Sequence, residues 1–213
     1  MPKIDSMQML LVAELRDLLD AERRLTKALP KMAKAAESDE LRQAFNEHLD
    51  QTEEHITRLE EALTALDVDP KGKTCHAMMG LIEEGSEHMS EDYGDESLRD
   101  AAIIGSAQKV EHYEIAAYGT AATFARLIGN DHVASLLEAT LQEEKDADKR
   151  LTQIAESYVN PEAEEEGGGE EEEQGAMTSS RGRSTGGRST GRTGGSSGGG
   201  SRGRSGTSSR SRR

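Results

Sequence analysis

Residues 14–36, ELRDLLDAERRLTKALPKMAKAA, decide the fold of this 213-residue chain, because apolar residues recur in them every three to four positions. Leu15, Leu18 and Leu25 belong to one apolar stripe, which predicts a long amphipathic helix. Glu22 interrupts this stripe at its middle. A buried carboxylate destabilises a fold unless it is paired or bound to a cation, so this position points to a partner inside the protein.

Three further segments repeat this design and place metal-binding residue types in the middle of an apolar stripe. In each predicted hairpin these residues lie about fifteen positions from the turn, counted in either direction. The hairpins therefore bring them to one level of a helical bundle. The polar residues are Glu22 in the first segment, Thr52 and His55 in the second, Glu111 and Glu114 in the third, and Glu144 in the fourth.

The lengths of the connections predict how the helices are arranged. The predicted helices cover residues 5–36, 39–66, 97–128 and 131–159. The last helix is expected to end before Pro161. Short turns join the helices of each pair, whereas the second and third are separated by residues 68–97, which include a short helical piece at 75–88. This long connection favours an all-α, ferritin-like four-helix bundle with one crossover, and an up-down bundle with an inserted loop is the alternative.

Composition divides the chain into two parts. Residues 162–174 contain eight Glu and no basic residue, and residues 175–213 contain nine Arg and no acidic residue. With almost no apolar side chains, this region cannot form a core, so we predict a folded domain at 1–161 and a disordered tail at 162–213. The Arg/Gly-rich part resembles nucleic-acid-binding segments, and a merely solubilising tail is the alternative. The acidic domain itself argues against direct nucleic-acid binding.

The cysteine content and the start of the chain bear on its compartment. Cys75 is the only cysteine, so no intramolecular disulfide can form, which favours a reducing, cytoplasmic location. Acidic residues interrupt the apolar N-terminal patch within a few positions, so we expect neither a signal peptide nor a membrane span.

The inward polar residues have the chemistry of a metal site. Carboxylates and imidazoles suit Fe, Mn or Zn, and a carboxylate can bridge two ions. Glu111 and Glu114 lie one turn apart on one helix face, as do Thr52 and His55. A solvated surface acid remains the alternative for Glu114.

Four stretches together carry a family resemblance. They are residues 14–36, quoted above, residues 41–60 (LRQAFNEHLDQTEEHITRLE), residues 107–120 (AQKVEHYEIAAYGT) and residues 136–151 (LLEATLQEEKDADKRL). Their order and spacing resemble the YciE/YciF family of ferritin-like proteins. The resemblance implies a ferritin-like four-helix bundle, a homodimer and a stress-associated protein of the kind labelled a ferroxidase.

The wider ferritin-like pattern places Glu on the first and third helices and Glu-x-x-His on the second and fourth. Glu22, His55 and Glu144 match this pattern, and the third helix offers two matching Glu residues. Thr52 stands where the second helix should carry Glu, and Ala147 stands where the fourth should carry His. The resemblance therefore implies a remodelled site.

From these features we hypothesise an oxidative-stress metalloprotein with a dinuclear Fe or Mn centre that oxidises Fe(II) with O₂ or peroxide. The predicted ligands are Glu22, His55, Glu111, Glu114 and Glu144. The residues expected beside them are His48, Thr52, Tyr118 and Asp148. For His48 we expect a hydrogen-bonded core residue or a neighbour of the ligands rather than a ligand, and for Asp148 a solvated acid is the alternative. The alternative function is a non-catalytic stress or scaffold protein, in which the inward polar residues form a hydrogen-bonded layer that fixes helix register.

Overall fold

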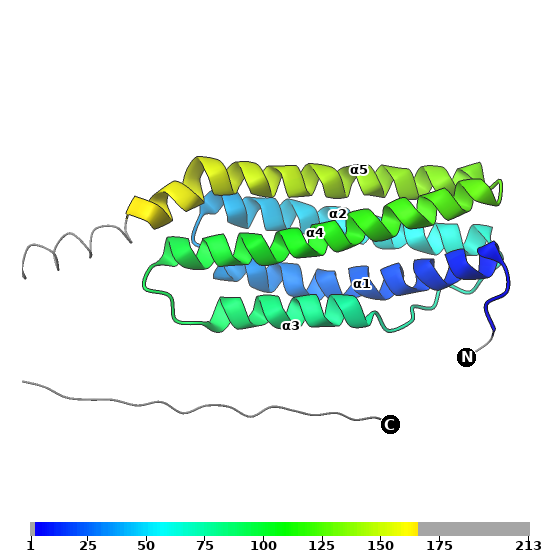
Figure 1. Cartoon of the computed structure of the whole chain (residues 1–213), viewed down its shortest axis with the longest axis horizontal. Helices are drawn as coiled ribbons and strands as arrows, with labels where there is room; N and C mark the ends of the chain where they lie inside the picture. Colours follow the sequence, from blue (N-terminus) through cyan, green and yellow to red (C-terminus); the bar gives the residue numbers. More distant parts are fainter. Residues whose placement is uncertain (1–2, 166–213) are drawn as a thin grey trace, which may run out of the picture.

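A computed structural model describes residues 3–165 of the chain, and within this range it is helical without strands (Figure 1). The helices are α1 (Met7–Ala35), α2 (Asp39–Ala65), α3 (His76–Ser90), α4 (Glu96–Leu127) and α5 (Asp131–Ile154). The predicted all-α bundle is confirmed, and α3 is the short helical piece expected within the long connection. The predicted tail lies outside the described residues.

Capping side chains explain where the long helices begin. The Ser6 hydroxyl accepts a hydrogen bond from the backbone N–H of Met9 at 3.2 Å, and Asn130 caps α5 in the same way. Such caps satisfy backbone donors that have no partner within the first turn of a helix. Between α4 and α5, Gly129 adopts a φ of 76°, a left-handed conformation that glycine reaches without strain, so the chain reverses there sharply.

The end of α5 differs from the prediction. Instead of ending before Pro161, the helix widens into a π-helical turn, η1 (Ala155–Val159), and helical structure continues to residue 165. In this wider turn the N–H of Asn160 donates to the carbonyl of Ala155, five residues earlier. A proline disrupts an α-helix because it lacks a donor and its ring meets the carbonyl four residues before it, and the change of helical register accommodates this local disruption.

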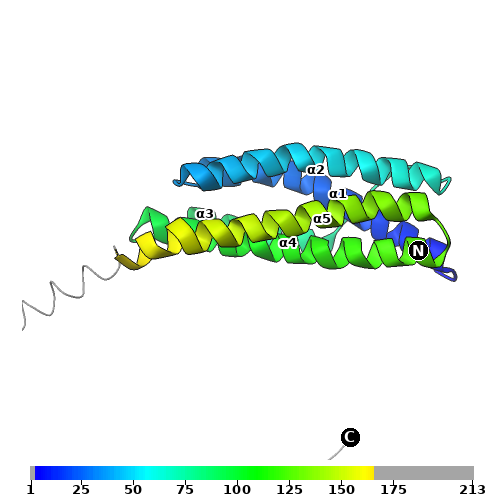
Figure 2. The same cartoon turned by 90° about the horizontal axis from the view of Figure 1, so that it is seen from above.

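The bundle consists of two antiparallel hairpins (Figures 1 and 2). One contains α1 and α2, and the other contains α4 and α5; α1 packs beside α4, and α2 packs beside α5. The connection from α2 to α4 travels the length of the bundle, with α3 packed against α4 and α1. This is the predicted crossover, and it rules out a short direct turn between the hairpins.

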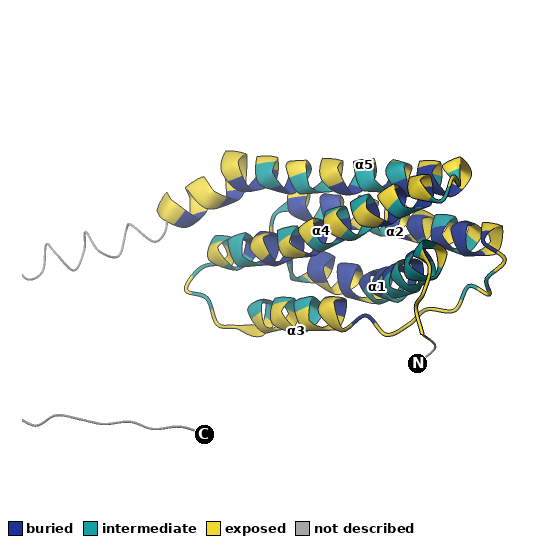
Figure 3. Ribbon diagram, turned by 45° about the vertical axis from the view of Figure 1, so that its right-hand side comes forward, coloured by how far each residue is buried: buried dark blue, intermediate teal, exposed yellow. Residues whose placement is uncertain are grey.

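The apolar core is divided into two clusters along the bundle. On α1, Leu18 belongs to one cluster and Leu25 to the other, and Glu22 lies between them. On α5, Leu137 and Leu151 are divided in the same way by Glu144. The buried faces of all four long helices point to this common interior (Figure 3). Because burying a leucine stabilises a fold by about 1.5–3 kcal/mol, the clusters can hold a polar layer between them.

Candidate metal centre

Helix α1 contributes Glu22, whose side chain is completely buried. The hydroxyl of Tyr118, from α4, donates a hydrogen bond to Oε1 of Glu22. Oε2 has no hydrogen-bond partner among the described residues. Tyr118 thus orients the carboxylate and leaves one oxygen available at the centre of the bundle.

Helix α2 contributes His55, which is also fully buried. Its Nδ1 atom lies 3.0 Å from Oε1 of Glu144 and 3.5 Å from Oε1 of Glu22, without hydrogen-bond geometry to either. Its Nε2 atom lies 2.9 Å from Oε2 of Glu143 and can donate a hydrogen bond to it. This arrangement turns Nδ1 toward the two buried carboxylates.

Glu143 is a residue of the candidate site that sequence reasoning missed. Its carboxylate joins His55 to Arg58, whose Nη2 donates to Oε1 of Glu143 at 3.0 Å. Histidines that bind metals almost always donate their second N–H to such a partner, which fixes the tautomer. One signal was present in the sequence, because the basic Arg58 lies one turn after His55 and Glu143 directly precedes Glu144. The pairing of residues 55 and 143 across the bundle has no local signature.

His48, expected beside the ligands, faces the ligand candidates directly. Its Nε2 atom is 3.6 Å from both Oε1 of Glu111 and Oε2 of Glu144, and it has no hydrogen-bond partner. Its Nδ1 atom lies 3.2 Å from Oε1 of Gln51, which can orient the ring. His48 therefore supplies a second imidazole from α2. In the ferritin-like pattern this imidazole comes from the fourth helix, which here carries Ala147 at that position.

Helix α4 contributes Glu111 and Glu114, and both are buried. Neither oxygen of Glu114 has a hydrogen-bond partner among the described residues, and the same is true of Oε2 of Glu111. The two carboxylates face the interior from consecutive turns. Glu114 is therefore a buried acid in the centre of the protein, which removes the solvated alternative.

The remaining two residues expected near the centre have contacts of a different kind. The Thr52 hydroxyl donates to the backbone carbonyl of His48 at 2.9 Å, within its own helix. Asp148 accepts a hydrogen bond from Gln108 at 3.1 Å and lies 3.4 Å from Nε2 of His112. Thr52 thus lies within the polar layer, where its hydroxyl is hydrogen-bonded to its own helix. Asp148 lies beside that layer and joins α5 to α4.

The ligand-type atoms form two groups that share one residue. Within each group, atoms from all members lie within 4.8 Å of one another. The members are His48, Glu111, Glu114 and Glu144 in one group, and Glu22, His55 and Glu144 in the other. The carboxylate of Glu144 has two oxygens, so it can contact both groups at once. The two groups could therefore hold two neighbouring cations that share the carboxylate of Glu144.

Burial controls ionisation in this layer. Burial and the nearby carboxylates raise the pKa of Glu111 and Glu114 well above the usual value. Burial also raises the pKa of Glu22. Burial alone would lower the pKa of His55, but its contacts with Glu144 and Glu22 outweigh this effect and raise it to about 10. Glu22, Glu111, Glu114 and His55 therefore hold protons more tightly than in water, whereas the contact with His55 lowers the pKa of Glu144 despite its burial.

The donor set fits a dinuclear metal centre. Each of the six ligand candidates has at least one buried atom without a hydrogen-bond partner among the described residues: Glu22, His48, His55, Glu111, Glu114 and Glu144. Buried polar atoms in native proteins nearly always have partners, so this concentration requires an explanation. Two divalent cations would balance four carboxylates and coordinate the oxygen and nitrogen atoms that remain free.

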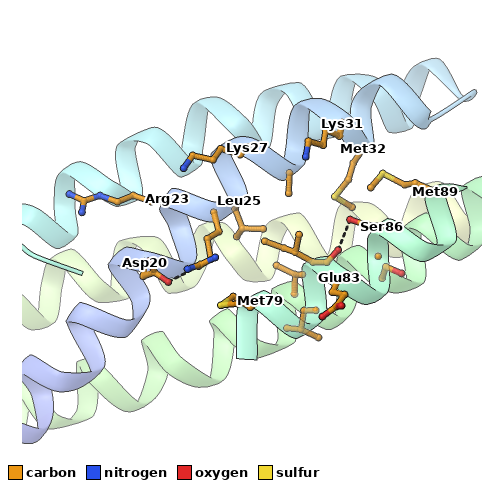
Figure 4. A pocket seen from close by; sticks show the side chains of 17 residues that line it. Asp20, Arg23, Leu25, Lys27, Lys31, Met32, Met79, Glu83, Ser86 and Met89 are labelled. Carbon is orange, nitrogen blue, oxygen red and sulfur yellow. Dashed lines mark hydrogen bonds and ion pairs between the residues drawn. The ribbon is translucent and has the colours of Figure 1, made fainter. Parts of the chain in front are cut away.

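A groove of about 560 Å³ lies on another side of the bundle, between α1 and α3 (Figure 4). Arg23, Lys27 and Lys31 lie along it, and Figure 4 shows Met32 and Met89 near one end. It is a separate surface feature, because the ligand candidates do not line it.

Comparisons with known proteins agree with this architecture. A family model described as "Domain of unknown function (DUF892)" matches residues 6–164. Protein YciF of Escherichia coli (strain K12) is 46% identical over 151 residues, which cover 70% of this chain and 90% of that protein. None of the helices in residues 3–165 is long and apolar enough to cross a membrane.

Solved structures extend the comparison. The crystal structure of the E. coli stress protein YciF has a TM-score of 0.70 at 42% identity and covers 74% of this chain and 99% of its own. A Rhodopseudomonas palustris protein, YcfI, whose name describes it as a candidate structural protein, also scores 0.70 at 42% identity and covers 72% of this chain and 97% of its own. These matches confirm the resemblance noted in the sequence: the chain belongs to the YciF stress-protein family.

Proposed function

We propose that the protein is a stress-response metalloprotein that binds two Fe or Mn ions in its mid-bundle layer and oxidises Fe(II) with O₂ or peroxide. The observation that carries this proposal is the pair of ligand groups joined at Glu144, with their unpartnered oxygen and nitrogen atoms. A bound dinuclear centre would supply redox chemistry, accepting electrons from Fe(II) and passing them to the oxidant.

The protein's own residues support that chemistry by holding and shielding the donor atoms. Glu143 and Arg58 orient His55, and the Tyr118 hydroxyl orients Glu22. The two apolar clusters on either side exclude bulk water, which strengthens electrostatic attraction for a cation. A preorganised, acidic layer between two apolar clusters is suited to a cation that changes its charge during turnover.

The alternative is a structural bundle without metal, which the description of the R. palustris relative favours. In such a protein the polar layer would stabilise the fold through hydrogen bonds among its own members. Both oxygens of Glu114 lack such bonds among the described residues, and the contacts of Glu144 are ion pairs with His55 and His48. This distribution supports a metal centre over a self-satisfied polar layer.

The first experiment measures metal content and Fe(II) oxidation together. We expect protein purified without added metal to take up close to two Fe or Mn ions per chain and to form Fe(III) faster than buffer. Glu144→Ala should lose most of this excess rate, whereas Glu53→Ala, at an exposed position of α2, should retain it. A protein without stoichiometric metal and with the rate of buffer would support the structural alternative.

The proposal extends to partners that the described residues leave untested. A homodimer is expected from the family, and sedimentation at several concentrations would reveal it.

The Arg/Gly-rich segment, which lies outside the described residues, is proposed to contact nucleic acid. Deleting residues 175–213 should then abolish retention on a DNA or RNA column at low salt, where phosphate contacts are strongest.

A further inference from the structure

A second cavity, of about 190 Å³, opens between α2 and α5. The buried side chains of His48 and Glu111 form its inner end, and the exposed Glu47 and Asp146 lie at its outer end. A water molecule occupies about 30 Å³ in the liquid, so the cavity has room for several waters. It therefore connects solvent to two of the six ligand candidates.

The exposure of the ligand candidates identifies the same place. The side chains of His48 and Glu111 keep 8% and 4% of their surface in contact with solvent. The other candidates have no exposed surface: Glu22, His55, Glu114 and Glu144. Solvent thus reaches the ligand groups from the α2–α5 cavity.

The larger groove between α1 and α3 is separated from the centre by an apolar wall. Leu25, Met32 and Val110 line that groove on one side and a small void beside His48 on the other. The void measures about 10 Å³, which is no more than the space of one water. A hydrated cation would have to lose its water among apolar side chains to pass there, which is strongly unfavourable.

Ala147 explains why the α2–α5 side is open. It lies on α5 one turn after Glu144 and lines the cavity with its single methyl group. A histidine here, as in the ferritin-like pattern, would project into this space. Helix α5 has no imidazole at this position, and His48 on the opposite wall of the cavity supplies one instead. Because no histidine side chain fills the space beside Ala147, the cavity stays open towards the centre.

The outer end of the cavity carries charges suited to a cation. Glu47 and Asp146 are acidic, and Arg150 forms an ion pair with Glu47 across the gap between α2 and α5. Acidic groups at an opening raise the local concentration of cations, whereas a guanidinium repels them. The Glu47–Arg150 pair therefore bridges the opening, and the charge of Arg150 partly cancels the attraction of the acidic groups for cations.

We propose that the α2–α5 cavity is the passage through which divalent cations reach and leave the metal centre, with Ala147 keeping it open and the Glu47–Arg150 pair controlling its mouth. This inference rests on the proposed function, because it requires a centre that binds cations. It assigns a role to residues that do not themselves bind the ions.

The test uses the kinetics of Co²⁺ uptake by the full-length, metal-free protein, followed by the absorbance of the bound ion. Ala147→Leu should slow both association and dissociation about tenfold or more, because passage must then wait for α2 and α5 to move apart. The dissociation constant and the stoichiometry should be unchanged, because a blocked passage slows both directions equally. Ala139→Leu, at an exposed position of the same helix, is the matched control and should leave both rates unchanged.

Surface substitutions at the mouth provide a second test with little risk to folding. Arg150→Gln should speed association, and Glu47→Gln should slow it, each by roughly twofold or more at low ionic strength, and both effects should shrink as salt screens the charges. Glu53→Gln makes the same charge change elsewhere on α2 and should have no comparable effect.

The possible failures are distinguishable. If the unaltered protein binds no Co²⁺ at equilibrium, the proposed function fails and the passage fails with it. If Co²⁺ binds but Ala147→Leu and the mouth variants all retain the original rates, the passage alone is wrong. A weaker affinity in Ala147→Leu without slower kinetics would also overturn it, because this would assign the residue to the ligand site.

Discussion

At the scale of single residues, Glu143 determines which nitrogen of His55 faces the centre. Its carboxylate accepts from Nε2 and is itself held by Arg58, so Nδ1 is left to the ligand group. We expect Glu143→Ala to weaken metal binding about 10- to 100-fold, the usual effect of losing a carboxylate behind a histidine ligand. Metal titration measures this loss. Gln142→Ala, at the exposed neighbouring position, should bind as before, and equal affinities for the two variants would contradict the role of Glu143.

Glu114 is a buried acid whose ionisation lowers the stability of the folded protein. Burial raises its pKa, so the folded protein binds the proton more tightly than the unfolded chain does. The contribution of Glu114 to the stability of the metal-free protein is therefore greatest at low pH. It falls as the pH rises above 4.5, the ordinary pKa of a glutamate side chain. His55 acts in the same direction between its ordinary value of 6.5 and about 10.

It follows that Glu114→Gln should stabilise the metal-free protein at pH 7 by about 1 kcal/mol or more, because it removes a buried carboxylate without changing the shape of the side chain. The same change should weaken metal binding. Thermal unfolding with and without chelator separates the two effects. A lower melting temperature of the metal-free variant would show that Glu114 stabilises the fold by a contact other than with metal.

At the scale of elements, Asp100 fixes the turn between α1 and α2 from outside that hairpin. It lies near the start of α4, and its buried carboxylate accepts hydrogen bonds from the backbone N–H groups of Glu37 and Ser38. Asp100→Ala should destabilise the protein by about 2–4 kcal/mol, because charge-assisted bonds are lost and two donors are left unpaired. Denaturant unfolding measures the change, and Glu96→Ala, exposed on the same helix, should cost much less.

The elements also show how far sequence reasoning reaches. The helices and the crossover followed from the spacing of leucines and from connection lengths, because both are local properties. The end of α5 did not, since a proline normally stops a helix, whereas here a π-helical turn before Pro161 lets the helix continue. Contacts such as Asp100 with Ser38 or His55 with Glu143 join residues far apart in the chain, so no local pattern predicts them.

At the scale of the whole molecule, the polar layer connects all four long helices between two apolar clusters. A metal that binds only the folded state adds stability according to its concentration and affinity, about 4 kcal/mol at a thousandfold excess over the dissociation constant. Added Fe or Mn should therefore raise the melting temperature, and chelator should lower it. Glu144→Gln should make the melting temperature insensitive to both. Calorimetry that finds no metal dependence in the unaltered protein would favour a purely structural layer.

The division of the ligand candidates between the hairpins has a consequence for biosynthesis. The first hairpin contributes both imidazoles and one carboxylate, whereas the second contributes three carboxylates and no imidazole: His48, His55 and Glu22 against Glu111, Glu114 and Glu144. Neither half presents a complete set to a passing ion while the chain is still on the ribosome. The proposed centre would assemble only when the second hairpin has been translated and docked, which would protect an emerging chain from early loading with redox-active metal.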